Sequence, residues 1–473
     1  MSNIPVKDVT PNQGSGSGES YDLYAKRQHI YVKKTSGLFQ KLRDISSYIM
    51  LFLFFTFSWL QWDGHQAVLF DLPARQFHVF NFTFWPQDFM LLSWLLIIMA
   101  FTLFFVTVFA GRLWCGYACP QFVWTWIFIK IEQLTEGDRN ARMKLNKQPM
   151  SGTKFARKFA KHLLWLLVGA VSAVAFVGYF SPVRELVPNI LAWDLGPWET
   201  WWLLFFTFGT YGAAGWLREQ VCIYMCPYAR FQSVMFDQDT LIISYDKARG
   251  ENRGSRKREA DYKAEGLGDC IDCGHCVHVC PVGIDIRDGL QYECVACGAC
   301  VDACDNIMER MGYDKGLVRY TTEHELEGKK THLLRPRLIG YFVAICAMFI
   351  AFSYVLFTRV PLEVDVIRER GQLYSTTPDG MIRNTYTLKL ANKSQKDNQY
   401  DIRLEGLDDA IIKGDTHVKI AVGELLDHTL YVEMDPRSLN KVNYEIEFVV
   451  TSTDGSGIEA DSESRFIGPT PTR

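Results

Sequence analysis

Two cysteine runs of identical spacing constrain this chain more than any other feature. Residues 270–281 read CIDCGHCVHVCP and residues 294–305 read CVACGACVDACD, so each run contains the pattern C-x2-C-x2-C-x3-C. In this bacterial ferredoxin pattern, three closely spaced thiolates hold one cubane and the fourth ligates the other cluster. The two runs are therefore expected to fold against each other around two iron–sulfur clusters.

The spacing assigns eight cysteines to two [4Fe–4S] clusters. The first ligand set is Cys270, Cys273, Cys276 and Cys304, and the second is Cys294, Cys297, Cys300 and Cys280. Structural zinc sites would instead use paired two-cysteine or cysteine–histidine arms. His275 and His278 lie within the first run, where we expect solvent-facing positions. Because a cubane cycles by one electron, the pattern predicts one-electron transfer.

Five apolar segments are long enough to cross a bilayer, which takes roughly 17–25 residues in a helix. They contain no Asp, Glu, Lys or Arg, and Trp residues gather near several of their ends, as in interfacial aromatic belts. The predicted spans are residues 45–62, 89–110, 163–180, 200–217 and 338–357. Buried core helices are the alternative, and the absence of charge argues against it. We therefore expect a multidomain protein in a lipid bilayer.

The distribution of Lys and Arg predicts the orientation of these spans. Basic residues are numerous in segments 26–43 and 111–161, whereas the 63–88 and 181–199 loops hold only Arg75 and Arg184. By the positive-inside rule, the N-terminus and the ferredoxin region are cytoplasmic and the C-terminus lies outside. This orientation places every cysteine motif on the reducing side of the membrane.

The same features divide the chain into five predicted regions. A cytoplasmic tail, disordered over residues 1–20, is followed by a transmembrane region of four helices, a cytoplasmic ferredoxin domain, a fifth transmembrane helix and an outer domain. Their predicted bounds are 1–44, 45–217, 218–337, 338–357 and 358–473. In the last region the runs TYTLKLAN, HVKIAV, HTLYVEM and YEIEFVV alternate between apolar and polar residues, which predicts a β-sandwich.

A second cysteine motif, CxxxCP, occurs twice. Of the 13 cysteines, Cys115 and Cys119 precede Pro120, Cys222 and Cys226 precede Pro227, and Cys346 stands alone. We expect each proline to begin a new helix at the end of a span. The neighbouring Arg112 and Arg218 are expected to lower the thiol pKa values. Three interpretations stay open for the four thiols: a shared metal site, a redox-active pair, or inert packing.

Several functions are disfavoured by what the chain lacks. The formal net charge of −3 provides no basic field for nucleic acid. None of the five apolar segments contains an interior His, which argues against a haem held by two histidines in the bilayer. They also lack the interior charged residues of a proton relay or an ion pathway.

Five stretches of the chain resemble the FixG/CcoG (RdxA) family of cytochrome c oxidase accessory proteins. They are QAVLFDLPARQFHVF, TFWPQDF, GRLWCGYACPQ, WLREQVCIYMCPYARFQSVMFD and GIDIRDGLQYECVACGACVDACD. The resemblance implies a bacterial inner-membrane protein with an immunoglobulin-like periplasmic domain. It also implies a role in assembling a cbb-type oxidase by reducing Cu(II) to Cu(I), with oxidase-assembly and copper-delivery proteins as partners.

Three functions are compatible with these observations. The first is a cupric reductase, in which an unidentified donor feeds the clusters and copper is handled near Cys115, Cys119, Cys222 and Cys226, because soft thiolates favour Cu(I). The second is an electron conduit that resembles the NapH- and NosR-type quinol dehydrogenases. The third is a non-enzymatic assembly scaffold.

Overall fold

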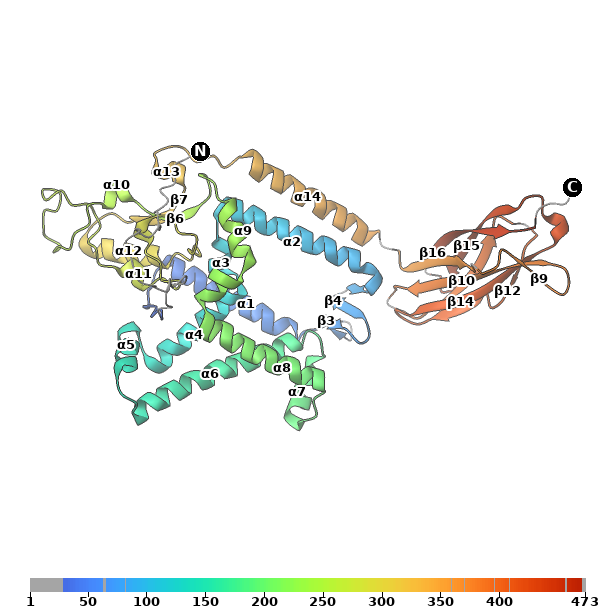
Figure 1. Cartoon of the computed structure of the whole chain (residues 1–473), viewed down its shortest axis with the longest axis horizontal. Coiled ribbons are helices and arrows are strands. Elements are labelled where there is room, and N and C mark those ends of the chain that lie inside the picture. Colours follow the sequence, from blue (N-terminus) through green and yellow to red (C-terminus); the bar gives the residue numbers. More distant parts are fainter. Residues whose placement is uncertain are drawn as a thin grey trace, which may run out of the picture.

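The structure is a computed structural model that describes residues 29–62, 65–80, 82–358, 360–369, 371–394, 396–407, 409–455 and 457–469 of the 473-residue chain. The tail expected to be disordered over residues 1–20 lies outside these described residues. Helices and the cysteine-rich region occupy one end of the molecule and a β-sandwich the other (Figure 1). The helix α14 (Pro336–Phe357) connects the two ends.

Five helices correspond to the predicted spans. They are α1 (Leu38–Phe57), α2 (Phe89–Ala110), α6 (Gly152–Val177), α8 (Pro197–Thr210) and α14. Among the described residues, three helices are both long and apolar enough to cross a membrane: α2, α6 and α14. The first two turns of α1 carry Lys41, Arg43 and Asp44, and α8 has only 14 residues. Five spans therefore remain a prediction.

The segment after α8 is wound more loosely than an α-helix. A π-helix, η2 (Tyr211–Leu217), continues α8, and a second one, η3 (Val221–Met225), follows after a turn at Arg218. Segments of π-helix are rare and frequently lie at functional sites. Here they bring the chain to the second CxxxCP motif.

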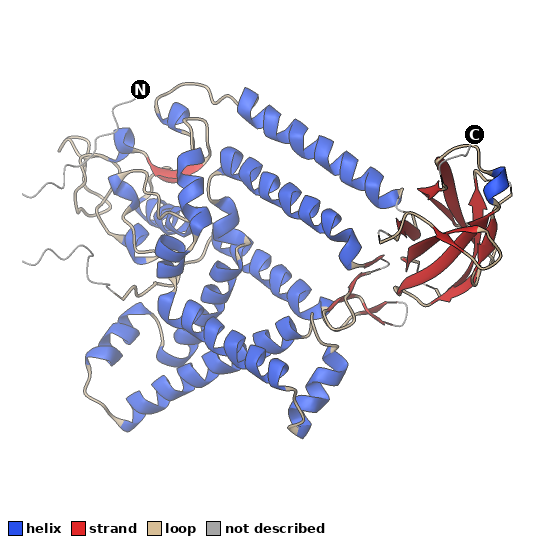
Figure 2. Ribbon diagram, turned by 45° about the vertical axis from the view of Figure 1, so that its right-hand side comes forward, coloured by secondary structure: helices blue, strands red, loops and turns tan. Residues whose placement is uncertain are grey.

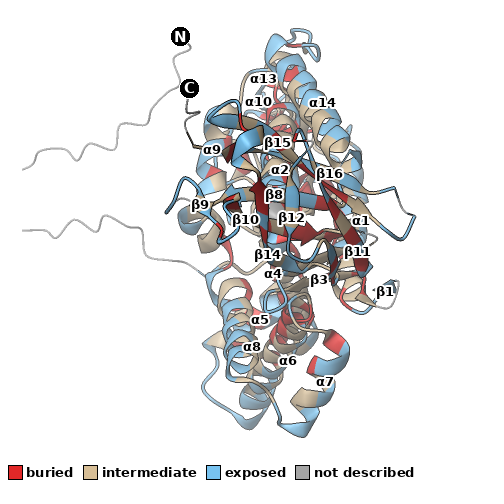
Figure 3. Cartoon of the chain, turned by 90° about the vertical axis from the view of Figure 1, so that its right-hand side faces the viewer, coloured by how far each residue is buried: buried red, intermediate tan, exposed pale blue. Residues whose placement is uncertain are grey.

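Four of these five helices pack in two pairs, as Figure 2 shows, and their outer faces remain exposed, as Figure 3 shows. Helix α14 lies along α2, where the Phe101 and Tyr341 rings are 6.1 Å apart. Helix α8 lies along α6, where Gly169 faces the Thr207 carbonyl. Small residues at such contacts allow close approach of helices in a membrane. Helices α2 and α14 carry large apolar side chains on their exposed faces. These faces are expected to contact lipid.

Shorter helices connect these long ones. They are α3 (Leu113–Tyr117), α4 (Pro120–Glu136), α5 (Arg139–Lys147), α7 (Val183–Ala192) and α9 (Pro227–Met235). Helices α4 and α9 begin at the prolines of the two CxxxCP motifs, as expected. Proline suits a first helical position because its fixed φ matches the helix and its missing N–H would be unpaired there anyway.

The cysteine-rich region is bounded by an antiparallel strand pair, β6 (Ile242–Tyr245) with β7 (Val318–Thr321). Its helical elements are α10 (Lys247–Gly250), α11 (His275–His278), η4 (Ile286–Asp288), α12 (Ala299–Met311) and α13 (Glu323–Leu326). Ile243, Met308 and Leu317 pack with buried cysteines in one core. The strand pair thus holds together the two ends of the segment that contains both cysteine runs.

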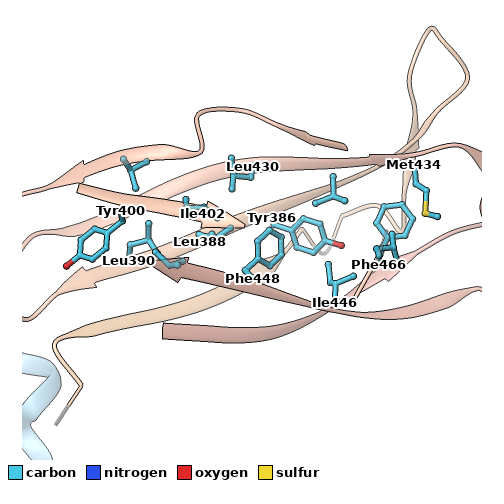
Figure 4. Packing of buried hydrophobic residues seen from close by; sticks show 14 of the residues in the cluster. Tyr386, Leu388, Leu390, Tyr400, Ile402, Leu430, Met434, Ile446, Phe448 and Phe466 are labelled. Carbon is cyan, nitrogen blue, oxygen red and sulfur yellow. The ribbon is translucent and has the colours of Figure 1, made fainter. Parts of the chain in front are cut away.

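The C-terminal region is a sandwich of two antiparallel sheets. One has the order β12-β14-β10-β8, with β9 paired to β10, and the other has the order β13-β11-β15-β16. The strands are β8 (Leu362–Arg368), β9 (Ser375–Thr376), β10 (Ile382–Asn392), β11 (Asn398–Glu405), β12 (Ile411–Lys413), β13 (His417–Ile420), β14 (Leu425–Met434), β15 (Asn443–Ser452) and β16 (Glu459–Ile467), and η5 (Pro436–Ser438) links β14 to β15. The four strands expected from sequence alternation are confirmed as β10, β13, β14 and β15. Tyr386, Phe448 and Phe466 fill the core between the sheets (Figure 4).

The connection between α1 and α2 forms a two-stranded and a three-stranded sheet, neither of which sequence analysis predicted. Its elements are β1 (Gln61–Trp62), β2 (His65–Gln66), β3 (Val68–Asp71), β4 (Gln76–Val79), β5 (Phe82–Phe84) and η1 (Pro86–Asp88). The buried Trp85 ring packs on Gly423 of the sandwich, and Lys393 Nζ lies 3.7 Å from an Asp88 carboxylate oxygen. The sandwich is therefore held against the N-terminal end of α2.

Candidate iron–sulfur and thiol site

The structure brings the eight ferredoxin cysteines together around two adjacent cavities. One cavity is lined by Cys270, Cys273, Cys276 and Cys304. The other is lined by Cys280, Cys294, Cys297 and Cys300, together with Cys276 from the first set. Each cavity thus receives three cysteines from one run and the fourth from the other, and the two cavities share a wall. This is the grouping that the spacing predicts, and the ligation of iron by these thiols stays a prediction.

The two runs repeat one backbone conformation, which explains how each wraps a cavity. Asp272 and Ala296 occupy equivalent positions, with φ of 52° and 50°, and Gly274 and Gly298 follow the next cysteine with φ of 63° and 73°. Two left-handed residues around one cysteine bend the chain sharply, and glycine carries this conformation without steric cost. Helices α11 and α12 begin directly after these glycines.

The surroundings of the thiols fit a group that binds thiolates. Burial raises the pKa of Cys276, Cys280 and Cys304 to about 12 and that of Cys294 to about 11. Thiolates without a bound metal are therefore unfavourable in this core. Iron must displace the protons of the thiol groups when it binds. Cys273 is the exposed member of the first set. The donor chemistry, the shared wall and the apolar lining suit two [4Fe–4S] clusters.

The His275 side chain does not have the solvent-facing role that we expected, whereas His278 is engaged through its backbone carbonyl. The His275 Nε2 lies 2.7 Å from Lys33 Nζ, and the His278 carbonyl accepts a hydrogen bond from the Lys33 backbone N–H at 2.9 Å. Both contacts attach the segment before α1 to α11.

A carboxylate between two cluster cysteines anchors α1. Asp302 lies in α12 between Cys300 and Cys304 and is buried. Its carboxylate accepts hydrogen bonds from the backbone N–H groups of Phe39 at 3.1 Å and Gln40 at 2.7 Å. A carboxylate at this position satisfies unpaired N–H groups and complements the helix dipole. Sequence reasoning missed this residue because its partners lie about 260 positions away.

The first CxxxCP motif packs directly on the second ferredoxin run. Cys115 lies in α3, and its buried side chain belongs to the same apolar cluster as Val295 and Cys297. A β-carbon on Gly116 would lie 2.6 Å from the Val295 carbonyl oxygen and 2.9 Å from Cys297 Cα. Glycine is therefore required by the close approach of the two backbones. The motif is in contact with the loop that carries a predicted cluster ligand.

Two tyrosines reinforce this contact. The Tyr117 and Tyr320 hydroxyl oxygens are 3.2 Å apart, and Tyr320 donates a hydrogen bond to the Ala296 carbonyl at 2.6 Å. On the other side of the motif, Arg112 donates hydrogen bonds to Gln232 and to the Tyr292 carbonyl. Gln232 also accepts a hydrogen bond from the Cys115 thiol at 3.3 Å.

The cysteines of the two CxxxCP motifs lie close enough for their charges to interact. Cys119 and Cys226 have extended backbones and directly precede α4 and α9. Burial raises the pKa of Cys222 to about 12, and the nearby Cys119 and Cys115 contribute to this shift. Within the described part of the chain, no group of three or more His, Cys, Asp or Glu is arranged to hold a single metal ion. The three interpretations of these thiols stay open.

The expectation that flanking arginines lower the thiol pKa values is wrong for three of the four cysteines. Burial is the largest effect at Cys115, Cys119 and Cys222, and it raises their pKa values despite the opposing charge of Arg112. Arg218 instead binds the buried Glu132 carboxylate at 2.7 Å. Its charge is therefore used in an ion pair.

Glu132 is the centre of a buried ion network that sequence analysis did not identify. Besides Arg218, it binds the fully buried Arg142 at 2.7 Å. Lys161 lies 4.0 Å from Glu132 and 2.9 Å from Glu136. These residues come from α4, α5, α6 and the turn after η2, so the network fixes the turn that precedes Cys222.

Comparison with known protein families agrees with this architecture. A family model of a 4Fe-4S dicluster domain matches residues 217–323, and one of a 4Fe-4S binding domain matches residues 92–130. A third, described as the IG-like fold at the C-terminus of FixG, matches residues 352–469. The first two matches include the second and the first CxxxCP motif, respectively.

Curated relatives cover nearly the whole chain. The nitrogen fixation protein FixG of Rhizobium meliloti is 34% identical over 95% of this chain and 91% of its own length. Protein RdxB of Cereibacter sphaeroides is 38% identical over 88% of this chain and 90% of its own, and protein RdxA of that organism is 37% identical over 82% and 84%.

A solved structure of a FixG-related protein from Vibrio parahaemolyticus is 34% identical, covers 23% of this chain and 95% of its own, and has a TM-score of 0.21. The relatives, the cysteine cavities and the apolar helices together identify the protein at the level of its family. This chain belongs to the FixG/RdxA family and is an iron–sulfur electron-transfer protein of the membrane.

Proposed function

We propose that this chain reduces Cu(II) to Cu(I) for the assembly of a cbb-type cytochrome c oxidase. The observation that carries the proposal is the packing of Cys115 and Gly116 on the loop of Cys297. In this contact Cys115, one of the four candidate copper thiols, packs against a predicted cluster ligand. Electrons from an unidentified donor would pass from the ferredoxin core through this packed contact to thiols that suit copper.

The predicted roles divide between two sets of cysteines. Cys270, Cys273, Cys276 and Cys304 hold one cluster, and Cys280, Cys294, Cys297 and Cys300 hold the other. Bound [4Fe–4S] clusters supply electrons one at a time, which matches the single electron that separates Cu(II) from Cu(I). Cys115, Cys119, Cys222 and Cys226 bind the copper substrate, because thiolates stabilise Cu(I) in preference to Cu(II).

The proposed topology has five spans in a bacterial inner membrane. The N-terminus and the ferredoxin region face the cytoplasm, and the sandwich faces the periplasm. Helix α14 supports this arrangement because it separates the two regions and its 22 residues suffice to cross a bilayer, which takes roughly 20. The sandwich is then available to oxidase-assembly or copper-delivery partners outside.

A cavity favours quinol oxidation as a second candidate function. It has a volume of about 530 Å³ and lies among α1, α4, α6, α8 and η2, with Ala118 and Pro120 on its wall. Its lining is mostly apolar, including Phe54, Trp124 and Phe176. Apolar cavities with a few polar groups are typical binding sites for small molecules. A quinone ring here would adjoin Cys119.

Metal analysis combined with EPR tests the copper proposal. We compare wild type with the quadruple serine variant of Cys115, Cys119, Cys222 and Cys226, both loaded with clusters and incubated with copper. The variant is expected to retain both cluster signals, to lose bound copper and to stop producing Cu(I). Production of Cu(I) by the variant at the wild-type rate would refute the role of these thiols.

A companion variant separates the candidate functions. Serine substitution of Cys273 and Cys297 is expected to abolish copper reduction and oxidase assembly together. Full oxidase assembly without clusters would instead support a scaffold role. Reoxidation of the clusters by a quinone analogue, blocked by filling the cavity at Gly209, would favour the quinol function.

A further inference from the structure

A basic cavity lies between the ferredoxin region and the start of α1. It has a volume of about 340 Å³, and its walls are the 32–37 segment, the first turns of α1, one face of α4, and Val279 and Pro281 beside the cluster cysteine Cys280. Figure 1 shows the start of α1 beside α11 and α12. The cavity is separate from both cysteine cavities and from the four CxxxCP thiols.

Positive charge dominates this cavity. Its lining contains five cationic side chains and one carboxylate: Lys33, Lys34, Lys41, Arg43 and Lys130, against Asp44. The Asp44 carboxylate already accepts hydrogen bonds from Gln40 at 2.6 Å and Trp126 at 2.8 Å, and it lies 3.5 Å from Lys130. It is therefore not available to neutralise the other cations.

Arg43 is the most buried of these cations, and its guanidinium carbon lies 5.9 Å from the centroid of the Phe122 ring. Its side chain is only 7% exposed, and its guanidinium binds the neutral Gln40 amide oxygen. Among the described residues no carboxylate forms an ion pair with Arg43, and its Nε has no hydrogen-bond partner. The buried Thr35 hydroxyl, also in the lining, lacks a partner too. A buried charge is costly unless an opposite charge and hydrogen bonds compensate it.

The donor set identifies the missing anion. A guanidinium, several ammonium groups and a hydroxyl around one space are the groups that bind phosphate oxygens. The Phe39 and Gln40 N–H groups at the start of α1 play no part, because Asp302 already accepts from them. We propose that this cavity binds the phosphate group of an anionic ligand through Arg43, Lys41 and Thr35.

The position of the cavity favours a membrane phospholipid as the source of the phosphate. On the part of α1 that follows Arg43, the side chains of Ile45, Tyr48 and Phe52 are 55%, 62% and 67% exposed. Such exposure is expected for a surface in contact with acyl chains. Basic pockets between helices at the cytoplasmic surface bind anionic head groups. A bound phospholipid would connect α1, α4 and the ferredoxin run. This inference does not depend on copper reduction.

Lipid retention tests the site in the full-length protein. Wild type, R43Q, K41Q and R157Q are reconstituted with phosphatidylcholine and phosphatidylglycerol, washed with detergent and examined by native mass spectrometry. Arg157 is the matched control, because it is exposed near the start of α6 and lies outside the cavity. Cluster absorbance reports folding of each variant.

Wild type and R157Q are expected to retain phosphatidylglycerol equally. R43Q should retain roughly 10- to 100-fold less, since it loses charge-assisted hydrogen bonds. K41Q should show a smaller loss in the same direction, and it decides the test if R43Q does not fold.

A second arm separates the two sources of phosphate. Delipidated protein is titrated with inorganic phosphate at constant ionic strength while the temperature of cluster loss is followed. Stabilisation of wild type but not of R43Q or K41Q, without retained lipid, would support the phosphate site and assign it a soluble ligand. Equal lipid retention and equal phosphate response in wild type, R43Q and K41Q would overturn the proposal.

Discussion

Substitution of Gly116 by alanine tests the contact between the CxxxCP motif and the ferredoxin core. The added methyl group would lie 2.6 Å from the Val295 carbonyl oxygen, whereas ordinary contacts begin at 3.4 Å, so the two backbones must separate by about 0.8 Å. The atoms that must move belong to the backbone, and overpacking of this kind typically costs about 1–3 kcal/mol. Gly116 lies in α3, where alanine would otherwise be favoured by about 1 kcal/mol.

Because rigid backbone atoms must move, we take the upper part of this range, about 2–3 kcal/mol, and the gain of about 1 kcal/mol leaves a net destabilisation of about 1–2 kcal/mol. This lowers the temperature of cluster loss by roughly 2–8 °C. The assay follows cluster absorbance during anaerobic heating, and EPR should show a change in the cluster nearest Cys297. Gly152→Ala is the control, because it also adds a methyl group to a helical glycine but into open space. If Gly116→Ala loses its clusters at the same temperature as Gly152→Ala, the inferred contact is wrong.

Three further predictions follow from other contacts. Cys304→Ser should damage the cluster of the first run and Cys280→Ser that of the second, as resolved by EPR and iron content; damage to the cluster of the same run in each case would reverse the assignment. Asp302→Ala removes the acceptor of two N–H groups and should cost about 1–2 kcal/mol, seen as faster hydrogen exchange in the first turn of α1. Unchanged exchange there would show that this cap is dispensable. Glu132→Gln breaks a buried pair and should cost about 3–5 kcal/mol in thermal denaturation. Glu327→Gln, in an exposed pair, should leave the denaturation temperature nearly unchanged; equal effects of the two substitutions would contradict the buried network.

Features that depend on local spacing could be predicted from the sequence. The doubled cysteine pattern anticipates which thiols line each cavity, because three ligands within seven residues must share one loop. Proline after each CxxxC pair predicts the starts of α4 and α9, and apolar alternation predicts the strands β10, β13, β14 and β15. Each of these patterns is set by the residues of a single segment.

Features that depend on contacts between distant segments could not be predicted. Gly116 and Tyr117 meet a loop about 180 residues away, and Asp302 reaches α1 across about 260 residues. The prediction that Arg218 lowers the thiol pKa values was wrong, because Arg218 pairs with Glu132 from another helix. In addition, burial raises the pKa values of three thiols by more than the arginine charge lowers them. The point at which α8 ends and the π-helix begins could not be predicted either, because both lie in one continuous apolar segment whose sequence does not mark the change.

The central claim is that electrons stored beside the CxxxCP thiols reduce copper. The most direct measurement is anaerobic mixing of chemically reduced, desalted protein with Cu(II), while cluster absorbance and a Cu(I)-specific chelator are followed together. The account predicts that both clusters are reoxidised as about two Cu(I) ions form per chain, since each cubane cycles by one electron. Clusters that stay reduced in the presence of Cu(II), with no Cu(I) formed, would contradict it.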